Sequence, residues 1–233
     1  MPLARLLGAH RDAVDVYNTS GGYLSMPINE VLENIDRARA RARGVGGIKL
    51  KVGSPDPSVD LKRVEAVREH LGDDVPLMVD ANQQWDRITA TRVGREGHAA
   101  LAATLDTPIA TCESLTSVGE HGALIEAGSS DFVQPDAPRV GGITPFLQIS
   151  ALADHRGRAL APHFVMEIHV HLSAAYPRTA WVEHFEWLEP MFNERLELKD
   201  GRMIIPDRGG LGLSLSEQAA AWTTESAVFG SGA

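Results

Sequence analysis

Residues 47–52 read Gly47-Ile48-Lys49-Leu50-Lys51-Val52, a short apolar run that carries two lysines two positions apart. The run follows a glycine-rich turn and precedes a helical pattern over 59–71, which is typical of a strand that leads into a helix. Further helical patterns cover 28–43, 119–127 and 143–156. Including the first, short apolar runs of this kind occur at 14–19, 47–52, 76–81, 108–113, 132–136, 159–163 and 181–185. Strands that alternate with helices predict a parallel sheet, and seven of them favour a (β/α) TIM-type barrel.

The predicted barrel is incomplete, because a closed barrel of this type has eight strands. Each of these runs has a polar residue at or near its end. Four pairs of successive end residues are 20–29 residues apart, whereas the pair Asp80 and Glu113 is 33 residues apart. That interval is long for one strand–helix unit and short for two. A helix that starts near residue 88 is expected to stop at 95–98, and a new one to start at residue 99. We therefore expect one unit to be missing between Asp80 and Glu113.

Size and charge restrict the class of protein. The 233 residues are 43% hydrophobic, which is enough for the core of one large domain. The net charge is −9 and no basic run is present, so nucleic acid and anionic membranes are not expected as partners. The single cysteine, Cys112, indicates a reducing compartment. Because no membrane span or signal peptide is recognisable, we expect a cytoplasmic protein.

Polar side chains end each expected strand. They are Asn18, Lys49 with Lys51, Asp80 with Asn82, Glu113, Asp136, His163 and Glu183. A buried strand gains no stability from a charged tip, and the carboxyl ends of barrel strands are where active sites lie. The repetition therefore predicts a functional site at that end of the barrel.

Lys49 and Lys51 are expected on one face of their strand, because side chains alternate along a strand. Two neighbouring ammonium groups lower each other's pKa, which would let one of them act as a base. Two solvated lysines at a strand end explain the same spacing.

Asp80 and Glu113 offer oxygen ligands that suit a hard cation such as Mg²⁺. Such an ion would stabilise the enediolate that forms when a proton leaves the carbon beside a carboxylate. Asp136 and His163 end consecutive strands, so the carboxylate could orient the imidazole. Each of these residues alone is also explained as a helix cap or turn residue.

His163, His169 and His171 invite a zinc interpretation, but their spacing does not match a zinc-protease helix. Ordinary packing or surface positions are favoured for these histidines. Cys112 is expected to be a small buried residue rather than a nucleophile.

Several ordered motifs resemble the mandelate racemase group of the enolase superfamily. They are Lys49-Leu50-Lys51, Val79-Asp80-Ala81-Asn82, Ala110-Thr111-Cys112-Glu113, Gln134-Pro135-Asp136 and Ala161-Pro162-His163. Two further stretches resemble the galactarate/L-talarate dehydratases and related acid-sugar dehydratases. These are Val16-Tyr17-Asn18-Thr19-Ser20-Gly21-Gly22 and Trp181-Val182-Glu183-His184-Phe185-Glu186-Trp187-Leu188.

The resemblance implies a role for each site residue, with a sugar acid as substrate and Mg²⁺ as cofactor. Lys51 would remove the proton α to the substrate carboxylate, with Lys49 tuning it. His163, oriented by Asp136, would protonate the departing hydroxyl or act as a second base. The other implied roles are metal binding by Asp80 and Glu113, and substrate binding by Glu183, Asn82 and Asn18.

The chain also departs from the family pattern. The strand that supplies the family's second metal ligand is absent between Asp80 and Glu113, and Cys112 stands where glycine is expected. An N-terminal capping domain is not recognisable either. We expect the incomplete barrel over 1–188, and over 189–233 a segment that in relatives packs toward that cap.

Three functions follow. The first is a hydro-lyase that converts a galactarate- or talarate-type acid to a 2-keto-3-deoxy acid. The second is a racemase or epimerase that uses the same two bases. The third is an inactive remnant with impaired metal binding, whose open barrel edges could lead it to form homo-oligomers.

Overall fold

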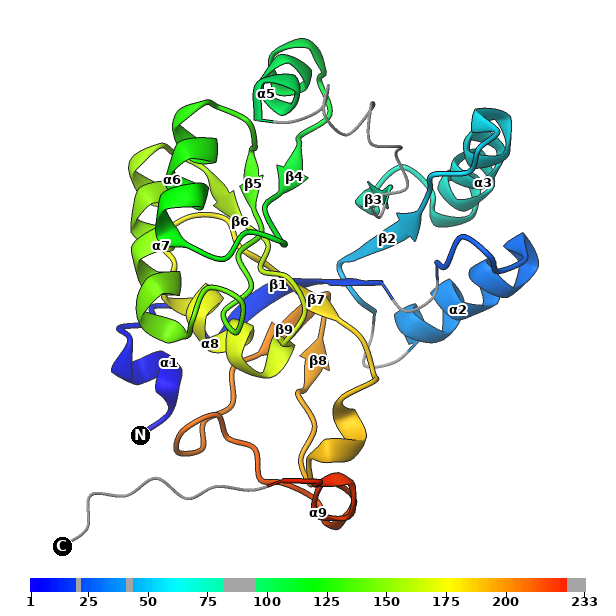
Figure 1. Ribbon diagram of the computed structural model, residues 1–233. Helices are drawn as coiled ribbons and strands as arrows, with labels where there is room; N and C mark the ends of the chain where they lie inside the picture. The colour runs from blue at the N-terminus through cyan, green and yellow to red at the C-terminus, as the bar shows by residue number, and fades with distance from the viewer. Residues whose placement is uncertain (20–21, 41–43, 82–94, 226–233) are drawn as a thin grey trace, which may run out of the picture.

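The computed structural model describes residues 1–19, 22–40, 44–81 and 95–225 (Figure 1). From the N-terminus, its elements are α1 (Leu3–Leu6), β1 (Ala13–Asn18), α2 (Ile28–Ala40), β2 (Gly47–Lys51), α3 (Pro57–Leu71), β3 (Leu77–Asp80), α5 (Arg95–Thr104), β4 (Ala110–Thr111), α6 (Val118–Glu126), β5 (Phe132–Val133), α7 (Ile143–His155), β6 (Ala159–Leu160), α8 (Met166–Ala175), β7 (Trp181–His184), η2 (Glu189–Met191), β8 (Leu198–Lys199), β9 (Arg202–Ile204) and α9 (Glu217–Trp222).

Strands β1 to β7 form the wall of a parallel barrel. β1 lies between β2 and β7, β3 pairs with β2, and β4, β5 and β6 pair in sequence. A parallel bridge between Leu160 and Ala180 joins β6 to the residue before β7. The order around the wall is therefore β3-β2-β1-β7-β6-β5-β4, with helices such as α2, α3, α6 and α7 outside it (Figure 1). The predicted (β/α) barrel and its seven strands are confirmed.

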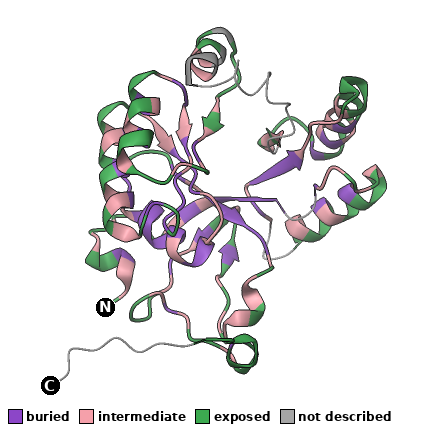
Figure 2. Cartoon of the chain, viewed as in Figure 1, coloured by how far each residue is buried: buried purple, intermediate pink, exposed green. Residues whose placement is uncertain are grey.

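Among the residues that the structure describes, the barrel is open between β3 and β4. These strands end the order, and within the described ranges no pairing joins them. Figure 2 shows the central strands β1, β2 and β7 mostly buried, whereas β3 and β4 are partly exposed. Val79 of β3 is 53% exposed, whereas Leu50 of β2 is fully buried. The opening lies at the interval where the sequence predicts a missing unit.

Residues of β2 show how alternation positions the site. Ile48 and Leu50 join the core cluster that includes Val31 of α2 and Val67 of α3. Because side chains alternate along a strand, Lys49 and Lys51 face the opposite way, into the barrel. Both faces of a barrel strand are covered, which explains why even Lys49 is only 7% exposed.

Local sequence sets where several helices begin. Asp56 accepts a hydrogen bond from the Ser58 N–H, and Pro57 occupies the first turn of α3. At the start of α6, the Ser117 hydroxyl accepts from the Glu120 N–H at 3.3 Å, while the Glu120 carboxylate accepts from the Thr116 N–H at 2.9 Å. These caps satisfy backbone groups that a helix end leaves without partners.

Some expectations about helices and strands are wrong or incomplete. The predicted helix break at 95–98 is wrong, because α5 runs without interruption from Arg95 to Thr104. A glycine inside a helix costs only about 1 kcal/mol, so Gly97 does not end it. The helix predicted to start near residue 88 begins outside the described residues. Helix α8 was not predicted; eight of its ten residues are buried, so it lacks the polar face that reveals a helix in sequence.

The antiparallel hairpin β8–β9 was also not predicted. β9 pairs with the first half of β1, from Ala13 to Asp15. β2 pairs with the second half of the same edge of β1. Residues after 188 thus contribute two strands to the main sheet, and the division at 188 stays a prediction. No helix within the described ranges combines the length and apolarity needed to cross a bilayer.

Candidate active site

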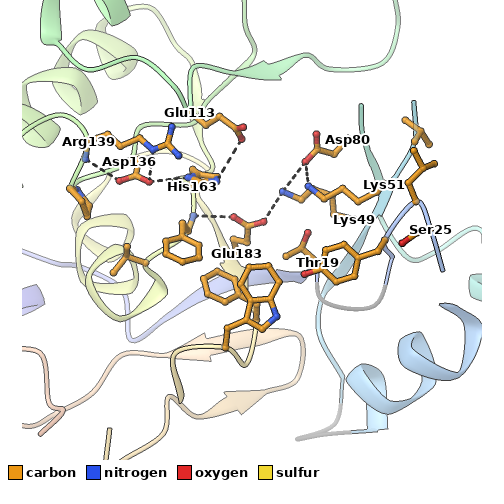
Figure 3. Close-up of a pocket in the computed structure, with 18 residues that line it drawn as sticks. Thr19, Ser25, Lys49, Lys51, Asp80, Glu113, Asp136, Arg139, His163 and Glu183 are labelled. Carbon is orange, nitrogen blue, oxygen red and sulfur yellow. Dashed lines mark hydrogen bonds and ion pairs between the residues drawn. The ribbon is translucent and has the colours of Figure 1, made fainter. Parts of the chain in front are cut away.

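A pocket of about 960 Å³ lies at the carboxyl ends of the strands (Figure 3). Seven of the nine predicted site residues line it: Lys49, Lys51, Asp80, Glu113, Asp136, His163 and Glu183. Asn82 lies outside the described residues. The pocket thus lies at the end of the barrel where the polar side chains predicted a functional site.

Lys49 and Glu183 form a buried ion pair at the pocket floor. The Lys49 Nζ donates to Glu183 Oε1 at 2.7 Å, and lies 5.1 Å from the centre of the Tyr17 ring. Burial alone would lower the pKa of Lys49, but the negative charges of Glu183 and Asp80 and the hydrogen bond to Glu183 raise it, and the net direction is upward. The expected mutual lowering of the two lysine pKa values is thus wrong for Lys49, because carboxylates surround its ammonium.

Glu183 is held in its ionised form. Its Oε2 accepts the backbone N–H of Phe164 at 3.0 Å, while Oε1 accepts from Lys49. Burial raises the pKa of Glu183, but the charge and hydrogen bond of Lys49 and the Phe164 N–H lower it further, so the net direction is downward. An ionised carboxylate cannot donate to a second carboxylate. In this structure Glu183 is the counter-ion of Lys49, and donation to a substrate carboxylate would need its protonated form, so the implied contact stays a prediction.

Lys51 shares Asp80 with Lys49. Lys51 Nζ lies 2.6 Å from Asp80 Oδ2, and Lys49 Nζ lies 3.5 Å from the same oxygen. The register of β2 and β3 explains this, since Lys51 and Asp80 are direct partners across the two strands. Asp80 thus holds both ammonium groups at the edge of the pocket.

On the opposite side of the pocket, His163 and Asp136 form a hydrogen-bonded pair (Figure 3). His163 Nδ1 and Asp136 Oδ2 are 2.9 Å apart, and the Arg139 N–H donates to Asp136 Oδ1 at 3.1 Å. Burial raises the pKa of Asp136, but the bonds from His163 and Arg139 outweigh it and lower that pKa. An ionised carboxylate can only accept, so Nδ1 carries the proton and Nε2 is directed to the pocket, 3.8 Å from Glu113 Oε2.

The described residues fit a magnesium ion only in part. Asp80 and Glu113 lie on either side of the barrel opening (Figure 3), and their oxygens have the chemistry that Mg²⁺ prefers. Yet in the described part of the chain no three His, Cys, Asp or Glu side chains gather closely enough to hold a metal. A bound magnesium ion would take two carboxylates from these residues and complete its shell with water or substrate oxygens.

Asn18 lies outside the pocket lining. It is 4% exposed, and its Nδ2 contacts the Nδ1 of His184 at 3.1 Å and the carbonyl of His184 at 3.3 Å. Because these contacts direct its amide toward β7, Asn18 ties β1 to β7. The substrate-binding role that the resemblance implies for Asn18 does not follow from this position.

Sequence reasoning missed the aromatic wall of the pocket. Phe164 stacks on Phe185 with 4.7 Å between ring centres, and Trp187 lies 5.1 Å from Phe185 and 6.1 Å from Tyr23. Phe164 has a positive φ of 67°, which is strained for a bulky residue and often marks functional sites. Trp187 belongs to a motif quoted for the resemblance, but no pattern links it to Tyr23.

The remaining histidines and the cysteine are structural, as favoured from the sequence. His169 Nε2 accepts the Ala137 N–H at 3.1 Å, and His171 bridges the Ala4 N–H and the Leu211 carbonyl. Burial raises the pKa of the Cys112 thiol to about 12, which makes it a poor nucleophile. Its φ of 99° agrees with the expectation of glycine at this position.

A parallel (β/α) barrel with a lysine pair facing a histidine–aspartate pair across one pocket defines an acid–base site at the carboxyl ends of the strands. The sequence profile described as enolase C-terminal domain-like matches residues 31–97 and 93–219. The chain belongs to this family. The predicted superfamily is thereby confirmed.

Two relatives of the chain are enzymes of known activity. The L-talarate/galactarate dehydratase of Salmonella typhimurium is 61% identical, over 99% of this chain and 62% of that protein. The 3,6-anhydro-alpha-L-galactonate cycloisomerase of Streptomyces coelicolor is 34% identical, over 92% of this chain and 64% of that protein. The chain thus spans less than two thirds of the length of these relatives.

A solved structure of L-talarate dehydratase from Polaromonas sp. JS666, complexed with Mg and L-glucarate, superposes with a TM-score of 0.90 at 59% identity. The match covers 96% of this chain and 65% of that one.

The comparisons also bear on the missing unit. The alignment with the Salmonella enzyme runs over 249 positions, and this chain has 233 residues, so at least 249 − 233 = 16 positions have no residue here. The two profile matches meet at 93–97, between β3 and β4. Both findings agree with a unit missing at the barrel opening.

Proposed function

We propose that this chain is the barrel part of a magnesium-dependent dehydratase of six-carbon sugar diacids. The observation that carries the proposal is the position of Lys51 and His163 on opposite sides of one pocket (Figure 3). A sugar acid bound between them would present its α-hydrogen to one group and its β-hydroxyl to the other. The ligand named for the Polaromonas structure, L-glucarate, has this chemistry.

Lys51 is the base in this proposal. In its neutral form, the Lys51 Nζ would take the proton from the carbon beside the substrate carboxylate. The barrel strand fixes that atom, because Lys51 ends β2 and its register partner Asp80 limits its position. A magnesium ion at Asp80 and Glu113, when bound, would stabilise the negative charge that develops on that carboxylate.

His163 is the acid. With Nδ1–H donated to Asp136, a protonated His163 carries its second proton on Nε2, which is directed to the pocket. Transfer of that proton to the β-hydroxyl would release water as the C–O bond breaks. The α-carbon electrons then form the C=C bond of an enol, which converts to the 2-keto-3-deoxy acid. One C–H bond and one C–O bond break, and the other product is water.

A racemase or epimerase is the second candidate. Its support is the same opposed arrangement, since a base on each face of a carbon can remove a proton from one side and return it to the other. Dehydration is favoured by the 61% identity to a dehydratase, compared with 25% to the L-Ala-D/L-Glu epimerase of Bacillus subtilis.

The test is an assay of galactarate, L-talarate and L-glucarate with Mg²⁺ in D₂O, with detection of keto-deoxy product and of deuterium at the α-carbon. Formation of product, lost in Lys51→Ala and His163→Ala but kept in the surface variant Lys62→Ala, supports the dehydratase. Deuterated epimer without product supports the second candidate. Absence of both, together with no saturable Mg²⁺ binding by calorimetry, overturns both and leaves an inactive relative.

A further inference from the structure

Arg139 lines the pocket beside the His163–Asp136 pair, and the proposed reaction leaves it without a role (Figure 3). Its backbone is fixed, because its N–H donates to Asp136 Oδ1 at 3.1 Å. Its side chain is 47% exposed. A guanidinium therefore stands at the His163 side of the pocket with access to a ligand.

The contacts of Arg139 differ from those of the two lysines. Lys49 and Lys51 each have a carboxylate oxygen within 2.7 Å. Arg139 Nε lies 3.5 Å from Asp136 Oδ2, beyond the usual 2.7–3.2 Å of a hydrogen bond, and that oxygen already accepts from His163. Neither Nη atom of Arg139 donates a hydrogen bond to any described residue.

A guanidinium with its Nη atoms available suits one ligand group in particular. Its planar pair of N–H donors matches the two oxygens of a carboxylate, which it binds more tightly and more specifically than an ammonium does. Galactarate, L-talarate and L-glucarate each carry two carboxylates. The reaction proposed above uses one of them, at the carbon whose proton Lys51 removes.

We propose that Arg139 binds the second carboxylate of the substrate, so that the pocket selects sugar diacids over the corresponding monoacids. This inference rests on the proposed function and names the feature of the substrate that the site recognises. The pocket has room for such a chain, at about 960 Å³. Arg139 is then a specificity residue, separate from the groups that move protons.

The alternative is that Arg139 only holds Asp136 in position. The two residues are three positions apart in the sequence and contact each other. Loss of its side chain would then weaken diacid and monoacid binding equally. The ratio of the two affinities distinguishes the two roles, because only a contact to the second carboxylate changes that ratio.

The experiment measures Kd for galactarate and for its monoacid galactonate by calorimetry in the presence of Mg²⁺. It compares the unmodified chain with Arg139→Met, Arg139→Lys and Arg156→Met. Arg156 is a matched control, because it is also 47% exposed and is paired with Glu126 outside the pocket. We expect galactarate to bind about 10- to 100-fold more tightly than galactonate, as one charge-assisted contact allows. Arg139→Met should remove this preference, Arg139→Lys should keep part of it, and Arg156→Met should keep all of it.

Three results would overturn the inference: no preference in the unmodified chain, a preference that survives Arg139→Met, or binding of neither acid. An assay of product formation distinguishes failure of this inference from failure of the proposed function. Product formation with an unchanged diacid preference in Arg139→Met overturns only the role of Arg139. A preference that depends on Arg139, without any product, supports the role of Arg139 and contradicts the dehydratase.

Discussion

Lys49 and Glu183 meet at the floor of the pocket in an ion pair of 2.7 Å, with side chains only 8% and 5% exposed. A buried charge without its partner is costly, whereas the intact pair gains little over apolar residues of similar volume. The two residues come from β2 and β7, which flank β1. The pair therefore joins two strands that are not paired with each other in the sheet.

We expect Lys49→Met to lower the free energy of unfolding by about 3–5 kcal/mol, because the buried Glu183 carboxylate would lose its counter-ion. Adding Glu183→Gln to that variant should restore part of the loss. Urea unfolding monitored by circular dichroism measures both changes. The exposed pair Arg156–Glu126 is the control, and Arg156→Met should cost less than about 1 kcal/mol. Equal losses at the two sites would contradict the prediction.

His169 should make stability depend on pH. Burial lowers the pKa of His169 to about 4 from an ordinary 6.5. Between these values the unfolded chain binds a proton that the folded chain does not, so stability falls as pH falls from 6.5 to 4. A shift of this size corresponds to about 3 kcal/mol.

The variant His169→Gln retains an oxygen that can accept the Ala137 N–H. We expect a flatter stability profile between pH 4 and 6.5 in this variant, measured by urea unfolding at several pH values. His155→Gln, at an exposed position on α7, should keep the slope of the unmodified chain. An unchanged slope in His169→Gln would show that other groups cause the pH dependence.

The sequence predicts the barrel well because each parallel strand is a short apolar run with a polar tip. It predicts the pair His163–Asp136 for the same reason, since its members end neighbouring strands. It does not predict the ion pair of Lys51 with Asp80, because it assigns Asp80 to a metal ion. It fails for α8, where burial on all sides removes the periodic pattern. It also fails for the ion pair of Glu183 with Lys49, because the two residues are far apart in the sequence. Contacts between Tyr23 and Trp187 likewise depend on tertiary packing that no local pattern encodes.

Cys112 adopts a φ of 99°, where side chains are strained and glycine is not. We therefore expect Cys112→Gly to be more stable than Cys112→Ala by about 0.5–1 kcal/mol, after allowing for the greater freedom of glycine in the unfolded chain. Both variants lack the thiol, so their difference isolates the backbone. Thermal unfolding measures it. Ala137 is buried and has no positive φ, so Ala137→Gly should be destabilising. If Cys112→Gly is likewise less stable than Cys112→Ala, the backbone at Cys112 is not strained.

Asp136→Asn tests whether the carboxylate directs the proton of His163. The ionised Asp136 can only accept, which keeps the proton on Nδ1 and directs Nε2 to the pocket. An asparagine can present either its NH₂ or its carbonyl, so the imidazole is no longer held in one form. We expect the rate of keto-deoxy product formation from galactarate to fall by about 10²–10⁴-fold, the usual contribution of a positioned acid. Asp131→Asn is the control, because Asp131 pairs with Arg158 and does not line the pocket. That variant should keep its rate, and thermal unfolding should show that both variants are folded. Full activity in a folded Asp136→Asn would mean that His163 delivers its proton without help from Asp136.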